Sequence, residues 1–301
     1  MGEFAALLTA FCWAGSSLLF TASSRVLGAL NTNRVRLVFA VLFLTAAHFL
    51  SKGSLLPFEA GVERWLWLGL SGIIGLTLGD AFLFHSFVLL GTRIATLIMT
   101  GVPVISTLIA WIFLGEVLSI TKIMGIGITV AGIALVILEQ SSNGKNKIKE
   151  RKSFLLGIST GVGGAICQAV GLVLAKRGMA GNYPALSAVV IRMIIGMTVL
   201  WMITLFTGQL RKVLQQIYQN RQALKFVAGG SIIGPVIGVW LSLVSIQATF
   251  VGIASTLMAL TPVILLPVAK WGYKENLSSR AVLGTLISIV GVTTIFIAPP
   301  V

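Results

Sequence analysis

Two stretches of this sequence repeat one another, ATLIMTGVPVISTLIAWIFLGEVLS at residues 95–119 and ASTLMALTPVILLPVAKWGYKENLS at residues 254–278. Matching positions lie 159 residues apart throughout, and two glycines beyond these stretches continue the same register. The matched positions are a proline, a glutamate, a serine and the two glycines: Pro103 and Pro262, Glu116 and Glu275, Ser119 and Ser278, Gly125 and Gly284, Gly132 and Gly291. A constant spacing over so many positions indicates an internal duplication.

The composition predicts that both copies lie in a membrane. The 301 residues are 56% hydrophobic and only 10% charged, whereas an average soluble domain has roughly 25% charged residues. A helix needs about 20 apolar residues to cross a bilayer. Ten apolar blocks meet this length or nearly do so: 4–24, 35–50, 65–90, 94–114, 123–138, 154–175, 186–206, 224–249, 253–271 and 282–298. The runs are continuous and lack the alternation of a membrane barrel strand, so we expect an all-α membrane protein.

The number of blocks in each copy predicts how the copies are oriented. Five blocks fall in residues 1–139 and five in residues 154–301, with a basic linker at residues 140–153. Because five is odd, the second copy must enter the membrane with the opposite polarity. Inverted repeats are typical of secondary transporters, whose binding site lies between the copies. We therefore expect ten transmembrane helices in two inverted five-helix repeats, and Arg36 and Arg192 extend the match at a spacing of 156.

The repeated motifs resemble those of the drug/metabolite transporter (DMT) superfamily, and within it the proteins with paired EamA domains. The resemblance is carried by two segments: Ala95 to Leu97 with Pro103, Gly115, Glu116 and Gly125 to Gly132, and Ala254 through Pro262 to Glu275, Gly284 and Gly291. It covers nearly the whole chain. It implies the ten-helix EamA fold, a central cavity lined mainly by helices one, three, four, six, eight and nine, and export or exchange of small metabolites such as amino acids.

The basic residues predict an orientation and argue against a nucleic-acid partner. The net charge is +14, but Lys and Arg are spread over many short loops and do not form one basic domain. The connections after the odd-numbered helices hold sixteen of them, Arg34 and Arg36 included, and the other side holds five. The positive-inside rule places the sixteen in the cytoplasm of a multi-pass cell-membrane protein, with both termini outside. The family resemblance implies cytoplasmic termini instead, so two orientations stay open.

Three ionisable residues inside predicted helices are candidates for function. Asp80 is the only acidic residue within a block, and a carboxylate in the membrane is costly unless it is paired, solvated or protonated. It could couple transport to protons or bind a cationic group, or it could form a structural ion pair with Arg36. Arg192 could bind an anionic group such as a carboxylate, or extend to the membrane interface. His85 could join Asp80 in a proton path, although the two do not share a helix face.

Polar side chains recur at helical spacing along several blocks and predict a cavity lining. The candidates lie in the first, fourth, sixth and eighth helices: Trp13, Ser16, Thr96, Thr100, Gln168, Trp240 and Gln247. A polar face avoids lipid, so it can line an aqueous cavity or make contacts between helices. The tryptophans and glutamines are the stronger candidates because they are large and polar-tipped.

The repeated prolines and glutamates suggest local roles. Pro103 and Pro262 fall in the middle of predicted helices, where proline leaves free the carbonyl oxygen four residues earlier. They could form hinges or static kinks. Glu116 and Glu275 come shortly before the starts of helices five and ten, where a carboxylate suits the positive end of a helix.

Motifs for catalysis, metal binding or a cofactor are missing from the sequence. His48 and His85 lie in different blocks without an acid at the spacing of metal ligands, and Cys12 and Cys167 are interpreted as packing residues. The leading hypothesis is a secondary transporter that needs no cofactor and moves small organic metabolites, either amino acids or amphipathic compounds, out of the cell. The alternatives are a non-transporting intramembrane enzyme or receptor, and an exchanger of solutes or phosphate esters with the same fold.

Overall fold

The computed structural model describes residues 1–90, 95, 98–139, 151–267 and 279–298, and all regular elements in those ranges are helical. The first half contains α1 (Gly2–Leu27), α2 (Ala29–Lys52), η1 (Phe58–Ala60), α3 (Gly61–Ser71), η2 (Gly72–Gly79), α4 (Asp80–Leu90), α6 (Val102–Leu114) and α7 (Ile120–Glu139). The second half contains α8 (Arg151–Gly178), α9 (Ala185–Phe206), α10 (Leu210–Gln219), α11 (Arg221–Ser231), η3 (Ile232–Gly238), α12 (Val239–Ala248), α13 (Val251–Met258), α14 (Thr261–Pro267) and α15 (Ser279–Ile297). The predicted all-α class is confirmed.

Many of these helices can cross a membrane. Among the described residues, six helical segments have the length and apolar composition for a full crossing: Gly2–Leu27, Leu30–Lys52, Phe58–Leu83, Lys152–Gly178, Ala185–Phe206 and Arg221–Ala248. Shorter apolar helices cover Val102–Leu114, Ile120–Val136, Val251–Pro267 and Val282–Ile297. Large apolar side chains are exposed along them, as a lipid environment favours. The chain is therefore a multi-pass helical membrane protein.

Each half contains one long helical rod with a widened middle. In the first half, α3, η2 and α4 run without interruption, and η2 is π-helical. In the second half, α11, η3 and α12 do the same, and η3 is π-helical. Gly75 and Gly79 of η2 lie 159 positions before Gly234 and Gly238 of η3. Short π-helical segments often occur at functional sites, and both of these border the cavity described below.

The helices that carry the repeated prolines begin close to those prolines. A turn at Thr100 and Gly101 precedes α6, and Pro103 is its second residue. A turn at positions 259–260 likewise separates α13 from α14, and Pro262 is the second residue of α14. Proline is well tolerated in the first turn of a helix because the missing N–H would be unpaired there. The predicted mid-helix placement is therefore wrong, and the prolines start new helices after a break.

Glycines allow α7 and α15 to pack backbone against backbone. A Cβ atom on Gly132 would lie 2.5 Å from the Ser288 nitrogen and 2.7 Å from the Gly284 oxygen. At the other end of the contact, a Cβ on Gly125 would lie 3.1 Å from the Gly291 oxygen. These pairings make the two helices antiparallel. Small residues permit such close approach of helices in membranes, which explains the four repeated glycines of the sequence.

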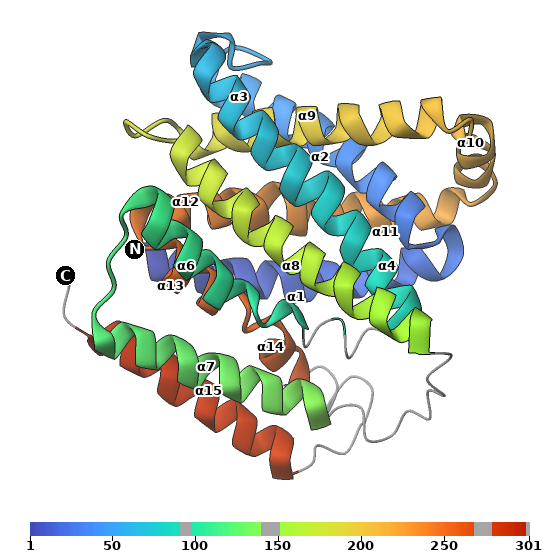
Figure 1. The fold of residues 1–301 in the computed structure, drawn as a ribbon. Helices are drawn as coiled ribbons and strands as arrows, with labels where there is room; N and C mark the ends of the chain where they lie inside the picture. The colour runs from blue at the N-terminus through green and yellow to red at the C-terminus, as the bar shows by residue number, and fades with distance from the viewer. Residues whose placement is uncertain (91–94, 96–97, 140–150, 268–278, 299–301) are drawn as a thin grey trace.

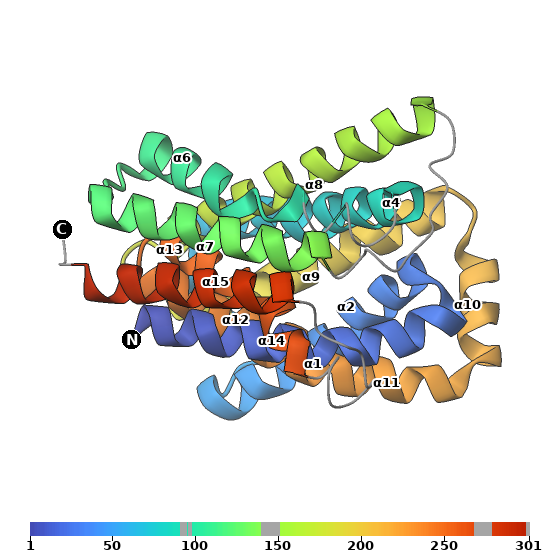
Figure 2. The same cartoon turned by 90° about the horizontal axis from the view of Figure 1, so that it is seen from below.

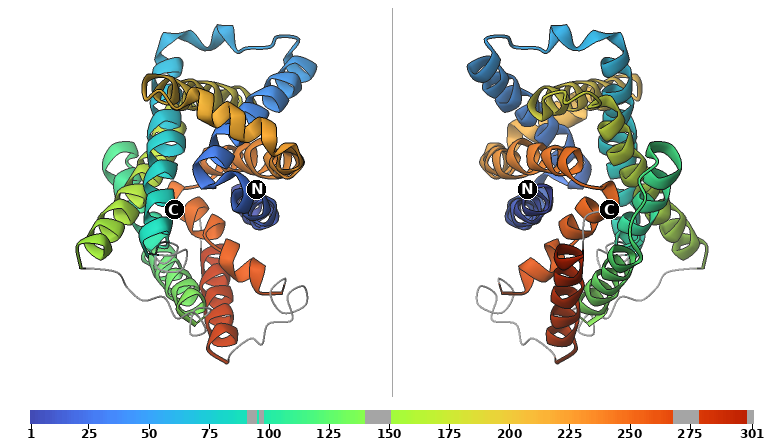
Figure 3. Two further views of the ribbon diagram at one scale, coloured as in Figure 1. Left: turned by 90° about the vertical axis from the view of Figure 1, so that its right-hand side faces the viewer. Right: turned by 90° about the vertical axis from the view of Figure 1, so that its left-hand side faces the viewer.

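The helices form one bundle whose long members run mostly along a common direction (Figure 1). α7 and α15 lie side by side along one edge, and Figure 3 shows this pair projecting away from the other helices. The start of α1 and the end of α15 lie at the same end of the bundle (Figures 1 and 2). At the opposite end, α10 crosses the direction of the long helices (Figure 2).

Two differences from the predicted spans affect the interpretation of charge. The second helix begins at Ala29, before the predicted block 35–50, so Arg34 and Arg36, both counted with the preceding connection, lie inside α2. The connection after α9 contains the unpredicted helix α10, which buries Val213 and exposes its basic and polar residues. The start of α2 was missed because basic side chains interrupt its apolar sequence. The helix α10 was missed because it is amphipathic and too short to span a membrane.

Candidate functional site

A cavity of about 410 Å³ lies between the two halves of the chain. Its walls come from α1, α2, the α3–α4 rod, the turn before α6, α8, α9, the α11–α12 rod and α13–α14. All six helices expected from the family resemblance contribute, and α2 and α9 are additional. The volume falls within the range of small-molecule sites, which is roughly 300–1,000 Å³.

Five residues predicted to line a cavity do so, and they come from helices that are distant in the sequence: Trp13, Ser16, Asp80, Thr100 and Gln168. Pro262, predicted as a hinge or kink, also borders the cavity. Trp13 and Ser16 share a face of α1 because they are three residues apart. Asp80 and Val239, the first residues after the two π-helical segments, both border the cavity. The widened turns therefore position the ends of η2 and η3 against the same space.

Other predicted residues lie elsewhere. Trp240 is 39% exposed on the surface of α12, and Gln247 donates a hydrogen bond through Nε2 to the Tyr183 carbonyl oxygen at 2.9 Å. His85 is exposed on α4 and does not border the cavity. A helix has several polar faces, and only the packing of neighbours selects the one that faces inward.

Two remaining predictions concern the fourth helix, and two concern the glutamates. Pro103 is buried at the start of α6 and lies outside the cavity lining. Thr96 and Glu275 fall outside the described residues. Glu116 does not act on the helix that follows it, because its carboxylate accepts the Val251 backbone N–H at the start of α13, at 2.8 Å.

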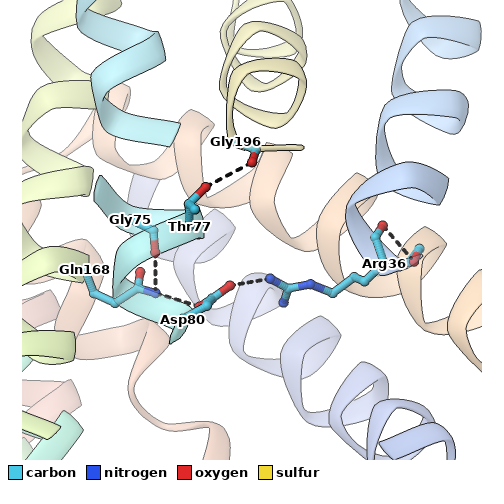
Figure 4. Close-up of polar contacts among 7 residues, drawn as sticks. Arg36, Gly75, Thr77, Asp80, Gln168 and Gly196 are labelled. Carbon is cyan, nitrogen blue, oxygen red and sulfur yellow. Dashed lines mark hydrogen bonds and ion pairs between the residues drawn. The ribbon is translucent and has the colours of Figure 1, made fainter. Parts of the chain in front are cut away.

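The Asp80 carboxylate is the centre of a polar network on the cavity wall (Figure 4). Its Oδ2 pairs with the Arg36 guanidinium at 2.5 Å, and its Oδ1 accepts a hydrogen bond from Gln168 Nε2 at 3.1 Å. The same Gln168 nitrogen donates to the Gly75 carbonyl oxygen at 3.1 Å. The ion pair with Arg36, one of the two alternatives for Asp80, is therefore present in the structure.

Arg192 approaches the same carboxylate from behind the cavity wall. Its residue is 3% exposed, and its charge interacts electrostatically with Asp80. A Cβ atom on Gly75 would lie 3.6 Å from its terminal nitrogen, so the guanidinium lies next to the π-helical segment that precedes Asp80. The side chain is enclosed within the protein. The alternative prediction, that it extends to the membrane interface, is therefore wrong. The two arginines matched at a spacing of 156 thus converge on Asp80.

Glycine contacts hold the rod that carries Asp80 against α8 and α9. The Cα atoms of Gly75 and Gly171 face one another, and a Cβ on Gly171 would lie 3.0 Å from the Gly75 Cα. Two hydroxyl groups of the rod reinforce the contact: Ser71 donates to the Gly171 carbonyl oxygen at 2.5 Å, and Thr77 donates to the Gly196 carbonyl oxygen at 3.0 Å (Figure 4). The close approach brings Gln168 within reach of Asp80.

The rest of the cavity wall is mainly apolar. Trp13, Phe20 and Leu76 border it together with Met258. The Arg36 guanidinium carbon lies 5.7 Å from the centre of the Phe20 ring, within the range of a cation–π contact. An apolar cavity with a few converging polar groups is the usual form of a small-molecule site.

Several lining residues were not predicted. They include Arg36, Met99, Met193 and Ser255, from α2, the segment before α6, α9 and α13. The sequence did offer one indication for Arg36. It matches Arg192 in the repeat, and because Arg192 lies inside a predicted span, the match indicates that Arg36 lies inside one as well. Methionines carry no such signal, since apolar residues on an inward face look like ordinary packing residues.

A second polar cluster links several helices at one end of the bundle. Lys176, in the last turn of α8, pairs with Glu116 at 2.5 Å and donates to the Thr249 carbonyl oxygen at 2.7 Å. The Thr249 hydroxyl donates to Glu3 in the first turn of α1 at 3.0 Å. These contacts connect α1, α8 and the α12–α13 junction with the connection between α6 and α7.

The fold and the cavity define a helical membrane protein with a central polar site, and comparison with known proteins identifies its family. The model of the EamA-like transporter family matches residues 1–138 and 155–297. The chain therefore belongs to the EamA-like transporter family, a group of DMT-type transporters. No curated protein matches it. A solved structure titled "Crystal structure of protein" has a similar fold, with a TM-score of 0.72 and 15% sequence identity over 97% of this chain and 94% of that chain.

Proposed function

We propose that the chain is a secondary active transporter that carries small organic metabolites across the membrane through the central cavity by alternating access. The observation that carries this proposal is the Arg36–Asp80–Gln168 network on the wall of an otherwise apolar cavity. Ionic groups are rare inside membrane proteins and usually mark a solute or ion pathway. Membership of a transporter family supports the same function.

The architecture that would support alternating access is a pair of inverted five-helix repeats, residues 1–139 and 154–301. Three structural features recur at the 159-residue spacing: the π-helical segments, the turns at 100–101 and 259–260, and the starts of α7 and α15 at Ile120 and Ser279. The antiparallel glycine contact between α7 and α15 agrees with a two-fold relation in the membrane plane. Rocking of one repeat against the other would then expose the cavity to either side.

The location is proposed from the charge distribution along the sequence. The side of the membrane to which the sequence assigns sixteen Lys and Arg residues, against five on the other, would be the cytoplasmic side of the cell membrane, and fourteen of the sixteen remain when Arg34 and Arg36 are placed inside α2. The substrates would be amino acids or amphipathic compounds, since the cavity combines aromatic and ionic groups. Efflux is the direction proposed for such solutes.

The test is counterflow of labelled solutes in proteoliposomes, comparing two alanine-to-tryptophan variants. Ala259 lines the cavity, so Ala259→Trp would fill it and abolish counterflow. Ala131 is exposed on α7, so Ala131→Trp would leave counterflow intact. Equal rates in both variants would sink the proposal that the cavity is the pathway.

Asp80 is proposed to couple transport to protons. It is the acidic residue that borders the cavity, and its partners Arg36 and Gln168 are both displaceable hydrogen-bond donors. Asp80→Asn cannot take up a proton, so its residual transport would no longer respond to a pH gradient. Transport by Asp80→Asn that keeps the pH dependence of the original protein would contradict the coupling role.

A further inference from the structure

The charges at the cavity do not balance. Among the described lining residues, the ionisable side chains are those of Arg36 and Asp80, and Arg192 adds a second guanidinium whose charge acts on Asp80. Two positive groups therefore face one carboxylate. An uncompensated charge inside a membrane protein is costly, so the empty site favours a ligand that supplies one negative charge.

Hydrogen-bond donors without an acceptor show where the excess positive charge lies. The Nε atoms of Arg36 and Arg192 are both buried without a hydrogen-bond acceptor. Arg36 borders the cavity while its guanidinium contacts Asp80 through a single terminal nitrogen. A guanidinium can hold a carboxylate through two parallel N–H bonds, so Arg36 keeps capacity for an acceptor that enters the cavity.

Asp80 can release Arg36 without becoming an isolated charge. Gln168 would still donate to its Oδ1, and Arg192 would still act on it from behind the wall. The arginine on the cavity face can therefore exchange one carboxylate for another, whereas the enclosed arginine keeps Asp80 compensated. In this arrangement Arg36 contacts the ligand and Arg192 does not.

We propose that this cavity selects small amphipathic monoanions, organic carboxylates with an apolar body and no cationic group, and that Arg36 receives the carboxylate. The inference rests on the proposed transport function and selects, from the two classes of solute proposed there, amphipathic compounds over amino acids. A monoanion would bring the site to electrical balance, while a zwitterion would leave one positive charge and an amine would add another. The apolar body would lie against Trp13, Phe20 and Met258, which line the same cavity.

A matched series of probes tests the head group on the intact protein. Hydrocinnamate, phenylalanine, phenethylamine, phenethyl alcohol and phenethyl phosphate share one aromatic body and differ in charge. Binding to the purified full chain would be measured by calorimetry at neutral pH, and counterflow in proteoliposomes. Hydrocinnamate would bind at least about tenfold more tightly than the others, since a hydrogen-bonded charge pair is worth about 1.5–3 kcal/mol. Equal or tighter binding of phenylalanine, the amine or the phosphate would overturn the proposal.

Variants assign the head group to Arg36. Arg36→Gln would weaken hydrocinnamate binding about tenfold or more and leave the alcohol unchanged, and Arg36→Lys would keep part of the difference because it retains the charge. Arg221→Gln, at an exposed residue of α11, is the matched control and would behave as the original protein. An equal loss for hydrocinnamate and alcohol in Arg36→Gln would contradict the assignment. Binding of hydrocinnamate without any counterflow would contradict the transport function and support the selectivity for monoanions. Counterflow of the amine alone would support the transport function and contradict the selectivity.

Discussion

Glu116 and Lys176 join the two halves of the chain through an ion pair of 2.5 Å, and Glu116 also accepts the N–H of Val251 at 2.8 Å. One carboxylate thus serves a lysine in α8 and the first turn of α13. Both side chains are mostly removed from solvent, with 24% and 9% exposure for lysine and glutamate. The pair lies among the contacts that connect the start of α1 with the ends of these helices.

Removing Glu116 is expected to cost more stability than removing Lys176. Glu116→Leu leaves the buried Val251 N–H without its acceptor and leaves the Lys176 ammonium without its counter-ion, with only the Thr249 carbonyl oxygen to accept from it. We expect a loss of about 2–4 kcal/mol, whereas Lys176→Met removes one partner of Glu116, a loss of about 1–2 kcal/mol. Thermal unfolding of the purified variants in one detergent measures the difference. Lys212→Met, at an exposed residue of α10, serves as the control. Equal losses for the two variants would show that the Val251 contact contributes nothing.

The Asp80 site predicts that a second substitution rescues a first. Asp80→Asn leaves two guanidinium groups without a carboxylate and is expected to lower the free energy of unfolding by about 2–4 kcal/mol. Adding Arg36→Gln restores the net charge of the original site, so the double variant is expected to recover at least half of that loss. Unfolding of both variants in detergent provides the comparison. A double variant less stable than Asp80→Asn would contradict the charge argument.

The contact between α7 and α15 predicts opposite effects for two glycines of one helix. Gly132→Ala places a methyl group against the backbone of α15, at 2.5 Å from the Ser288 nitrogen, and is expected to cost about 1–3 kcal/mol because the helices must separate. A Cβ on Gly127 meets nothing within 4 Å, so Gly127→Ala is expected to be neutral or stabilising through helix propensity. The melting temperatures of the two variants should therefore differ in sign or size, and equal destabilisation would argue against the packing.

The proposed orientation predicts which loop an impermeant reagent reaches. In a background with Cys12→Ser and Cys167→Ser, Glu59→Cys places a thiol in η1 and Lys152→Cys places one at the start of α8, at the opposite end of the bundle. With the basic connections in the cytoplasm, intact cells would label the Glu59→Cys variant alone, and permeabilised cells would label both. Labelling of the Lys152→Cys variant in intact cells would reverse the orientation.

The sequence predicted the helical class, the duplicated register and five residues of the cavity wall. These depend on hydropathy and on repeated motifs, which are local properties of the chain. Trp13 and Trp240 looked alike in the sequence, yet the first lines the cavity and the second is 39% exposed. The difference arises from which neighbours each helix face meets, and that information lies in the tertiary packing.

The features that the sequence did not predict are departures from regular helix geometry. The π-helical segment η3 contains Pro235, which has no backbone N–H to donate, and η2 contains Gly75 at a close contact with α8. The prolines at positions 103 and 262 were interpreted as mid-helix residues because apolar residues continue on both sides of them. Arg36 was counted as a loop residue because nearby charges hid the start of α2.

The two arginines around Asp80 have a consequence for the energetics of a transport cycle. Without solute, this site holds about one unit of net positive charge, and each elementary charge moved through a membrane potential of 100 mV changes the free energy by about 2.3 kcal/mol. A monoanion cancels that charge. Voltage would therefore act on the return of the empty carrier and leave the carrier that holds a monoanion beside an ionised Asp80 nearly unaffected.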